Sequence, residues 1–146
     1  MISEPAVDDV DGLAYLFDAY RRFYGRSADV VSARRYVQER LTDGPTRFFV
    51  DREGEVVRGF VHLLPSFDTL AMRAMWILED LFVEPSARGE GIGAALLTHA
   101  EQFARETGAS RLTLATAHTN THAQRLYERH GWVLDNEFRS YHRSLR

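Results

Sequence analysis

The stretch from Ile77 to Ala104, ILEDLFVEPSARGEGIGAALLTHAEQFA, decides the fold of this chain. It starts with an apolar run that predicts a buried strand, is interrupted at Pro85, and opens into a glycine-rich turn over residues 88–93. A helix follows, because apolar residues recur about every 3.6 positions on one face. The members of that face are Ile92, Leu96, Ala100, Phe103 and Ala104. A glycine turn at a helix N-terminus offers free backbone N–H groups and the positive end of the helix dipole, so the unit predicts a phosphate or pyrophosphate seat.

Two familiar phosphate-binding motifs do not account for this turn. The P-loop needs a lysine and a hydroxyl residue after its last glycine, and the turn has neither. Residues 89–94 do fit the dinucleotide fingerprint G-x-G-x-x-[GA]. That motif requires an acid about twenty residues further on, and Leu112–Thr116 contains none. The dinucleotide interpretation is therefore rejected.

What remains is R-x-x-G-x-[GA], preceded by Leu81, Val83 and Pro85. This pattern resembles the acyl-CoA-binding signature of the GNAT superfamily of N-acetyltransferases. The resemblance implies that the backbone of Leu81 and Val83 pairs with the pantetheine arm of acetyl-CoA, in a gap between two splayed central parallel strands. It also implies a pyrophosphate seat made by Arg88, Gly89, Gly91, Gly93 and Ala94.

Length and composition agree with a single domain over residues 1–146. The net charge is −3 and no basic run is present, so we expect no nucleic-acid partner. The chain has no cysteine, which excludes disulfides, thiolate metal sites and an acyl-cysteine intermediate. No apolar segment is long enough for a membrane span and the N-terminus does not resemble a signal peptide. We expect no membrane partner and a cytoplasmic location.

Hydrophobic periodicity and turn residues predict the order βααβββαβαββ, an α/β (α+β) mixed sheet with helices on both faces. This order agrees with the GNAT-type acyl-CoA N-acyltransferase fold that the resemblance implies. The expected strands are Ile2–Glu4, Arg47–Asp51, Val56–Leu64, Arg73–Val83, Arg111–Ala117, Trp132–Leu134 and Phe138–His142. The expected helices run from Asp8 or Asp9 to Gly25, from about Ser32 to Gly44, through the signature segment to Gly108, and from Asn120 to Gly131.

A second motif runs from Asn120 to Trp132 and reads N-x-x-A-x-x-L-Y-x-x-x-G-[FWY]. It resembles a stretch of the same superfamily, which implies that Tyr127 is the general acid for the departing thiolate and that Asn120 hydrogen-bonds the cofactor arm. A phenol with an ordinary pKa near ~10 suits that acid. The structural alternative is a tyrosine at the edge of the core.

Glu79 and Asp80 are acids within an apolar strand, which is costly unless they are paired or face a cleft. Side chains in a strand alternate between faces, so the two are not expected to point into one site. The L-E-D-x-F-V arrangement resembles the diamine (spermidine/spermine) acetyltransferases, in which the Glu contacts the amine. Glu79 is therefore predicted to recognise the amine or act as general base, directly or through a water, and Asp80 to pair structurally.

The histidines do not predict a metal site. His118 and His122 are four residues apart, but they span a junction between a strand and a helix and lack a third ligand at motif spacing. We therefore expect no metal. His62 and His142 occupy predicted strand positions and receive no role.

The acceptor groove of this fold is usually walled by the first two helices and their connection, here Tyr20–Asp29. Within it, Tyr24 is a candidate substrate contact. A polyamine site would be expected to carry acids, whereas this segment carries Arg21, Arg22 and Arg26. The arginines favour a small amine that also bears a carboxylate, such as an amino acid or a thialysine-like compound. An ordinary solvated helix face explains Arg21 and Arg22 at least as well.

The sequence thus predicts an acetyl-CoA-dependent N-acetyltransferase that moves an acetyl group to a primary amine of a small molecule. Transfer would be direct, in a ternary complex, because no cysteine can carry the acyl group. A homodimer through the last strands is expected by resemblance. A non-enzymatic acyl-CoA-binding or sensing module, a protein or peptide acetyltransferase, and an acyl group other than acetyl remain open.

Overall fold

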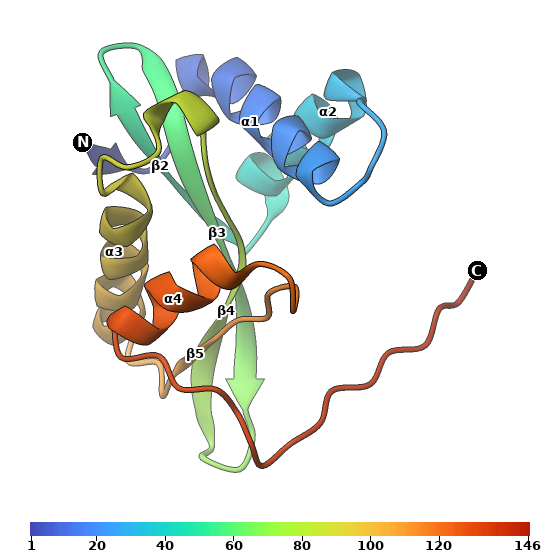
Figure 1. Ribbon diagram of the computed structural model, residues 1–146, viewed down its shortest axis with the longest axis vertical. Coiled ribbons are helices and arrows are strands. Elements are labelled where there is room, and N and C mark those ends of the chain that lie inside the picture. Colours follow the sequence, from blue (N-terminus) through green and yellow to red (C-terminus); the bar gives the residue numbers. More distant parts are fainter. The chain divides into compact units, whose positions relative to one another are not determined.

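The computed structural model describes residues 1–146 and contains both strands and helices (Figure 1). The strands are β1 (Ile2–Ser3), β2 (Arg47–Glu53), β3 (Val56–Asp68), β4 (Arg73–Val83) and β5 (Leu112–Thr113). The helices are α1 (Val10–Phe23), α2 (Val30–Asp43), α3 (Ile92–Glu106) and α4 (Thr121–Arg129), with two short 3-10 turns, η1 (Val7–Asp9) and η2 (Pro85–Ala87). Residues 1–115 and 116–146 make two units, and each is described by itself.

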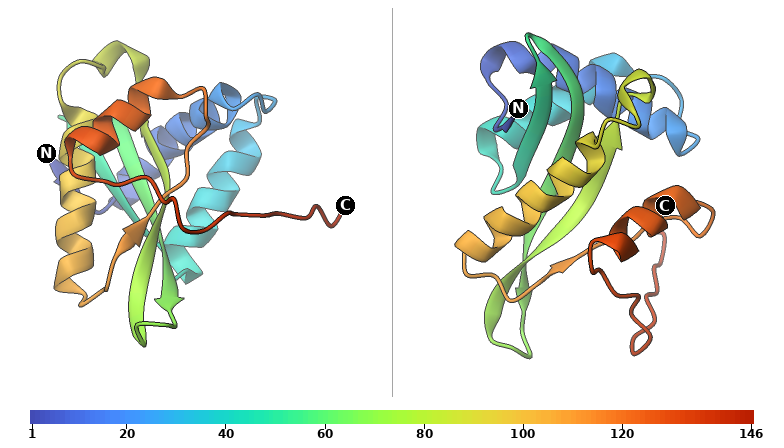
Figure 2. Two further views of the ribbon diagram at one scale, coloured as in Figure 1. Left: turned by 60° about the horizontal axis from the view of Figure 1, so that its bottom comes forward. Right: turned by 60° about the vertical axis from the view of Figure 1, so that its left-hand side comes forward.

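One five-stranded sheet organises the first unit, in the order β1-β2-β3-β4-β5. Neighbouring strands are antiparallel up to β4, and only β5 runs parallel to its neighbour. Helices α1 and α2 cover one face and α3 covers the other (Figure 2). The mixed sheet with helices on both faces confirms the predicted fold class.

Apolar side chains from the sheet and from two helices bury each other on the face covered by α1 and α2. That cluster comprises Leu13, Leu16, Val37, Phe48, Val50, Val57, Phe60 and Phe82. On the other face, Gly59 allows α3 to lie close to β3, because a Cβ at this position would be 3.2 Å from the side chains of both Ile92 and Leu96. Gly59 pairs with Val83, so this contact places the first turn of α3 beside the end of β4.

A β-bulge interrupts β4 at Glu79. Leu78 pairs with Leu63, and Asp80 pairs with the adjacent residue His62. β4 therefore has one residue more than β3 at this step, and Glu79 is the extra one. Leu78 therefore faces α3, whereas Asp80 and Phe82 face α1. The expected strict alternation of side chains does not hold here, because the bulge inserts one position into the period of two.

The pairing between β4 and β5 is short. Only Trp76 with Leu112 and Ile77 with Thr113 are paired. The strand expected over residues 111–117 is therefore limited to two residues. A parallel pair that ends this early leaves the rest of β4 without a paired strand on that side.

The C-terminal end of β3 also differs from the prediction. β3 continues through Pro65 to Asp68, whereas the prediction ended it at Leu64. Pro65 has no N–H to donate, and it lies opposite Trp76, whose own N–H donates to the Arg111 carbonyl oxygen on the other side (3.2 Å). The proline thus costs the β3–β4 ladder no hydrogen bond.

The second unit, residues 116–146, contains α4 and a segment without helix or strand. The strands expected over residues 132–134 and 138–142 are not formed. A strand needs a hydrogen-bonded neighbour, and local β-propensity does not supply one. No helix in the structure is both long and apolar enough to cross a membrane.

Candidate functional site

The backbone groups of Leu81 and Val83 point away from β3. The Glu84 N–H donates to the Arg58 carbonyl oxygen (2.7 Å), which continues the register of β3 with β4. Hydrogen-bonded and non-hydrogen-bonded residue pairs alternate along an antiparallel ladder, so Val83 and Leu81 belong to the second kind. Their N–H and C=O groups face the side where β5 pairing has already ended. This edge can accept an extended ligand as an additional strand.

The turn between η2 and α3 leaves room for an anion. Gly89 and Gly91 adopt φ angles of +87° and +80°, and nothing lies within 4 Å of a Cβ built on either residue. Gly91 is the N-cap of α3, so no side chain caps the first turn, which contains Gly93 and Ala94. Free N–H groups at the start of a 15-residue helix favour a negatively charged ligand.

Charges around this turn are arranged to tolerate an anion. The exposed Arg88 lies with its guanidinium 5.3 Å from the centre of the Phe82 ring, and its Nε donates to the Val83 carbonyl oxygen (3.1 Å). Its terminal N–H groups remain available to a phosphate. The one acid within the turn, Glu90, lies 3.4 Å from a nitrogen of Arg58, which partly neutralises it.

The β4 bulge presents two acids in different settings. Glu79 is exposed, whereas the Asp80 side chain is only 13% exposed. The Asp80 Oδ2 lies 2.9 Å from the Nδ1 of His62, a side chain 2% exposed whose ring stacks on Phe48 at 4.0 Å between centres. Asp80 therefore has the structural partner that was expected of it.

Tyr20, on α1, packs against this part of β4. Its ring contacts the ring of Phe82, which lies two residues after Asp80 on the same face of the sheet. Burial, followed by the negative charge and hydrogen bond of Asp80, raises the pKa of the Tyr20 phenol well above its ordinary value. Tyr20 is consequently a neutral hydroxyl throughout the working pH range of proteins.

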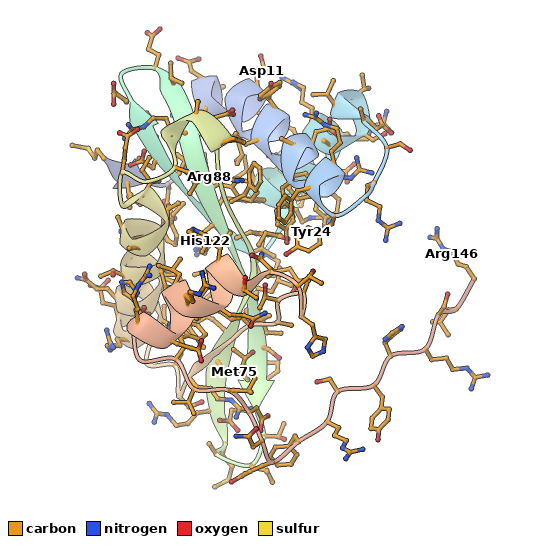
Figure 3. All side chains as sticks on the ribbon, in the orientation of Figure 1. Asp11, Tyr24, Met75, Arg88, His122 and Arg146 are labelled. Carbon is orange, nitrogen blue, oxygen red and sulfur yellow. The ribbon has the colours of Figure 1, made fainter.

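Aromatic rings pack around the Tyr20 ring. The Tyr20 ring meets Tyr24, Phe60 and Phe82 edge to face, at 5.2, 6.0 and 5.9 Å between centres. Tyr24, the predicted substrate contact, is 44% exposed and lies at the C-terminal end of α1 (Figure 3). Tyr24 therefore packs beside Tyr20 through its ring.

The arginines of the α1–α2 connection are already engaged. Arg21 Nη1 lies 3.0 Å from Asp18 Oδ1, and Arg22 Nε lies 3.4 Å from Asp18 Oδ2. Asp18 is 4% exposed and also accepts a hydrogen bond from the Asp29 N–H (2.9 Å). These two arginines therefore compensate a buried carboxylate, which favours the structural interpretation over carboxylate recognition for them.

Two predicted site residues lie in the second unit, one on α4 and one at its N-cap. The Asn120 side-chain oxygen accepts the Ala123 N–H (3.2 Å) and caps the helix, which leaves its amide N–H₂ group for other partners. Tyr127 is partly buried, with its ring 6.0 Å from that of Trp132. The Trp132 N–H donates to the Tyr127 carbonyl oxygen (3.0 Å), which holds the C-terminal end of α4 together.

Sequence reasoning missed His62 and Tyr20. A signal was present for His62, because it follows Phe60 at the strand period of two on a buried face, and a buried polar group needs a partner. Its partner could not be identified, since pairing His62 with Asp80 depends on the bulge. No group of three or more His, Asp or Glu side chains is arranged to hold a metal ion.

Comparison with known proteins identifies the architecture. A model described as the acetyltransferase (GNAT) family matches residues 13–132. A solved structure described as a probable acetyltransferase superposes with a TM-score of 0.93 at 34% identity, covering 100% of this chain and 98% of that one.

Two curated relatives differ in how much of their length matches this chain. The protein described as uncharacterized N-acetyltransferase YhfO, from Bacillus subtilis (strain 168), is 36% identical over 140 residues, which is 96% of this chain and 94% of that protein. Thialysine N-epsilon-acetyltransferase from Bos taurus is 34% identical over 76 residues, covering 52% of this chain and 44% of that protein. Both similarities are to proteins named for acetyl transfer to nitrogen.

Proposed function

Because the chain belongs to the acetyltransferase (GNAT) family, we propose that it transfers an acetyl group from acetyl-CoA to a primary amine of a small molecule. Two neighbouring features carry this proposal. The N-terminus of α3 has no side-chain cap, and the end of β4 that precedes it has no strand beside it on the β5 side. The α3 N-terminus offers N–H groups to a pyrophosphate, and the β4 edge offers backbone N–H and C=O groups to an amide-containing arm.

Acetyl-CoA fits the residues that flank this junction. Leu81 and Val83 would bind the pantetheine arm through their backbone. The turn residues Arg88, Gly89, Gly91, Gly93 and Ala94 would bind the pyrophosphate. Asn120 would contribute its free amide group to the arm. Support comes from the open space at both glycines and from the partly neutralised Glu90.

Glu79 is the proposed proton acceptor for the amine. An amine must be neutral when it attacks a thioester carbonyl, and the carboxylate would remove its proton directly or through a water. The bulge supports this role, since bulges re-aim side chains next to active sites. Tyr24 would contribute to the wall of the same amine site.

Tyr127 is the proposed general acid, which would protonate the departing thiolate. Direct transfer in a ternary complex follows from the absence of cysteine. A Tyr127→Phe variant keeps the ring and removes the proton, so it should bind acetyl-CoA as the wild type does and lose turnover by about 10²–10⁴-fold. Unchanged turnover would eliminate Tyr127 as the acid.

The acceptor class is the least constrained part of the proposal. Amino acids, thialysine-like compounds and polyamines all present a primary amine. The relative named for thialysine supports the second group over roughly half of the chain. Since Arg21 and Arg22 are paired with Asp18, only Arg26 remains from the argument for an acceptor carboxylate.

A free-thiol release assay with acetyl-CoA tests the proposal. The panel holds lysine, thialysine, several other amino acids, spermidine and small aminoglycosides. Thiol release with one class of amine is the expected result. Acetyl-CoA binding without release for any amine would favour a protein acceptor or a non-enzymatic acyl-CoA sensor. Faster thiol release from a longer acyl-CoA than from acetyl-CoA would show that the transferred group is not acetyl.

A homodimer in the cytoplasm, where acetyl-CoA is available, completes the proposal. Residues 133–146 form neither helix nor strand and expose Val133, Leu134, Phe138, Tyr141 and Leu145, the last at 92%. Exposed apolar side chains in one segment mark an interaction surface. Sedimentation velocity should give a dimer, and a monomer at all concentrations would contradict this part.

A further inference from the structure

Arg58 lies beside the glycine turn, at a β-bulge near the start of β3. Asp51 pairs with Gly59 and Arg52 pairs with Val57, so β3 has one residue more than β2 at this step, and Arg58 is the extra one. The next residue, Gly59, is where β3 lies close to α3. The bulge therefore places a guanidinium near the N-terminal end of α3, and none of the roles proposed above uses it.

Three carboxylates hold this guanidinium in place. Nε and Nη2 of Arg58 lie 2.9 and 2.8 Å from Oδ2 of Asp51, a residue that is 5% exposed. Nη1 lies 2.7 Å from Oε2 of Glu53 and 3.4 Å from Oε1 of Glu90. The Arg58 side chain is only 19% exposed, and its planar fork is fixed by these contacts. Its positive charge is therefore held beside the turn before any ligand arrives.

Glu90 is the group that opposes an anion in this turn. It stands between Gly89 and Gly91, the two glycines whose open surroundings admit a phosphate. A carboxylate at this position repels a pyrophosphate unless a cation lies close to it. The cation that Glu90 contacts is Arg58.

No second cation is at hand to replace Arg58. Arg58, Glu53 and Glu90 line a cavity of about 660 Å³ bounded by α1, the β2–β3 turn and η2. Glu55 and Glu84 line it as well, and Arg58 is the one cation among the lining residues. Removal of the guanidinium would leave four carboxylates facing one another beside the phosphate turn, which makes the local potential unfavourable for an anion.

We propose that Arg58 is a positioning residue for acetyl-CoA, which holds and offsets the Glu90 carboxylate and thereby sets the affinity of the turn for the pyrophosphate. Arg58 acts through Glu90 and does not itself contact the phosphates. This inference rests on the proposed function, because it assumes that the turn binds the pyrophosphate of acetyl-CoA.

A purely structural role for Arg58 makes a different prediction. The guanidinium compensates the buried Asp51, so Arg58→Gln should lower the melting temperature in either case. If Arg58 acts through Glu90, adding Glu90→Gln restores acetyl-CoA affinity to the Arg58→Gln variant without restoring its stability. If Arg58 acts only on the fold, or directly on the phosphates, Glu90→Gln has the same effect on affinity with and without Arg58.

The experiment measures the affinity of acetyl-CoA by calorimetry, and that of S-acetylpantetheine, which lacks phosphate, by nuclear magnetic resonance titration. The variants are Arg58→Gln, Glu90→Gln and the double variant. Arg34→Gln is the control, because it removes a cation from an ion pair with Asp11 between α1 and α2 (2.6 Å).

Arg58→Gln should weaken acetyl-CoA about 5-fold or more, and the double variant should bind it within about 2-fold of Glu90→Gln. The affinity for S-acetylpantetheine should not change in any variant, because this ligand carries no phosphate for Glu90 to repel. Arg34→Gln should bind both ligands as the wild type does.

Equal effects of Glu90→Gln in the two backgrounds, or equal weakening of both ligands by Arg58→Gln, would overturn the inference. If Arg58→Gln does not fold, Arg58→Lys takes its place. A lysine keeps a cation beside Asp51 but cannot contact Asp51, Glu53 and Glu90 at once, so the same Glu90-dependent loss is expected.

The wild type separates this inference from the proposed function. Wild-type protein that does not bind acetyl-CoA would contradict the proposed function and, with it, the role of Arg58. Wild-type protein that binds acetyl-CoA and whose affinity is unaffected by Arg58→Gln would contradict the role of Arg58 alone.

Discussion

Replacing Glu79 by Gln removes one negative charge from an exposed position on the β4 bulge and leaves the core unchanged. Without this base, the amine must already be neutral when it reaches the site, so turnover at neutral pH should fall by about 10²–10⁴-fold. The remaining activity should rise with pH toward the pKa of the amine, near ~10 for a lysine-like group. The pH profile of kcat/KM measures both effects.

Glu55→Gln is the matched control for this change, because it removes the same charge from an exposed turn. It should keep the wild-type profile. A Glu79→Gln variant with wild-type activity and an unchanged pH profile would show that Glu79 is not the base.

Single residues also show what the sequence can and cannot reveal. Asn120 was predicted to cap a helix, and its side chain does so, because capping depends on residues three positions apart. The partner of Asp80 could not be predicted, since His62 is eighteen residues away and the pairing passes through a bulge. Contacts between residues that are close in the sequence can be predicted from it, whereas the register between strands depends on the whole sheet.

At the level of elements, the glycine turn before α3 offers a direct test. Gly91→Ala places a Cβ on a residue with φ of +80°, which costs about 1–2 kcal/mol in that conformation. The turn should shift away from its present geometry, and acetyl-CoA affinity measured by calorimetry should fall by about 10-fold or more, because several backbone N–H groups lose alignment.

Gly108→Ala is the matched control at the other end of the same helix. Gly108 has φ of +77° with equally open surroundings, so its backbone strain is comparable. This variant should lose similar thermal stability and keep its acetyl-CoA affinity. Equal affinity losses in the two variants would mean that the N-terminal turn of α3 holds no phosphate.

The tip of the β3–β4 hairpin is fixed by Asp68. Its Oδ2 accepts from the Ser110 hydroxyl (2.8 Å), and this hydrogen bond, aided by Arg111, lowers the pKa of the Asp68 carboxyl below its ordinary value. A lowered folded-state pKa means that ionised Asp68 stabilises the fold above the unfolded pKa of about 3.9. That stabilisation is lost as pH falls through the folded-state pKa.

The variant Asp68→Asn should therefore melt below the wild type at neutral pH, and the gap in Tm should close as the pH falls below about 4. Thermal melts at several pH values measure this gap. A gap that stays constant down to about pH 3 would show that the charge of Asp68 contributes nothing to stability.

Elements differ in how well their bounds could be predicted. The bounds of β4 were predicted in full, because a long apolar run bordered by turn residues carries its own signal. β5 is shorter than predicted and the last two strands are not formed, since a strand exists only where a neighbour provides hydrogen bonds. Because β5 is short, the part of β4 after Ile77 has no paired strand on that side.

At the scale of the whole molecule, the chain is an acetyltransferase of the GNAT type. The residues proposed to bind acetyl-CoA follow a sequence signature and could be named in advance. The contact between His62 on β3 and Asp80 on β4 has no such signature, and only the fold reveals it.

The most direct measurement of the central claim compares the two products of one reaction. The protein is mixed with acetyl-CoA and the preferred amine of the panel, free thiol is quantified by absorbance, and the amine and the intact protein are weighed by mass spectrometry. The account predicts one N-acetylated amine for each thiol released, with the mass of the protein unchanged. Thiol release without acetylated amine, or an acetyl group retained on the chain as an intermediate, would contradict it.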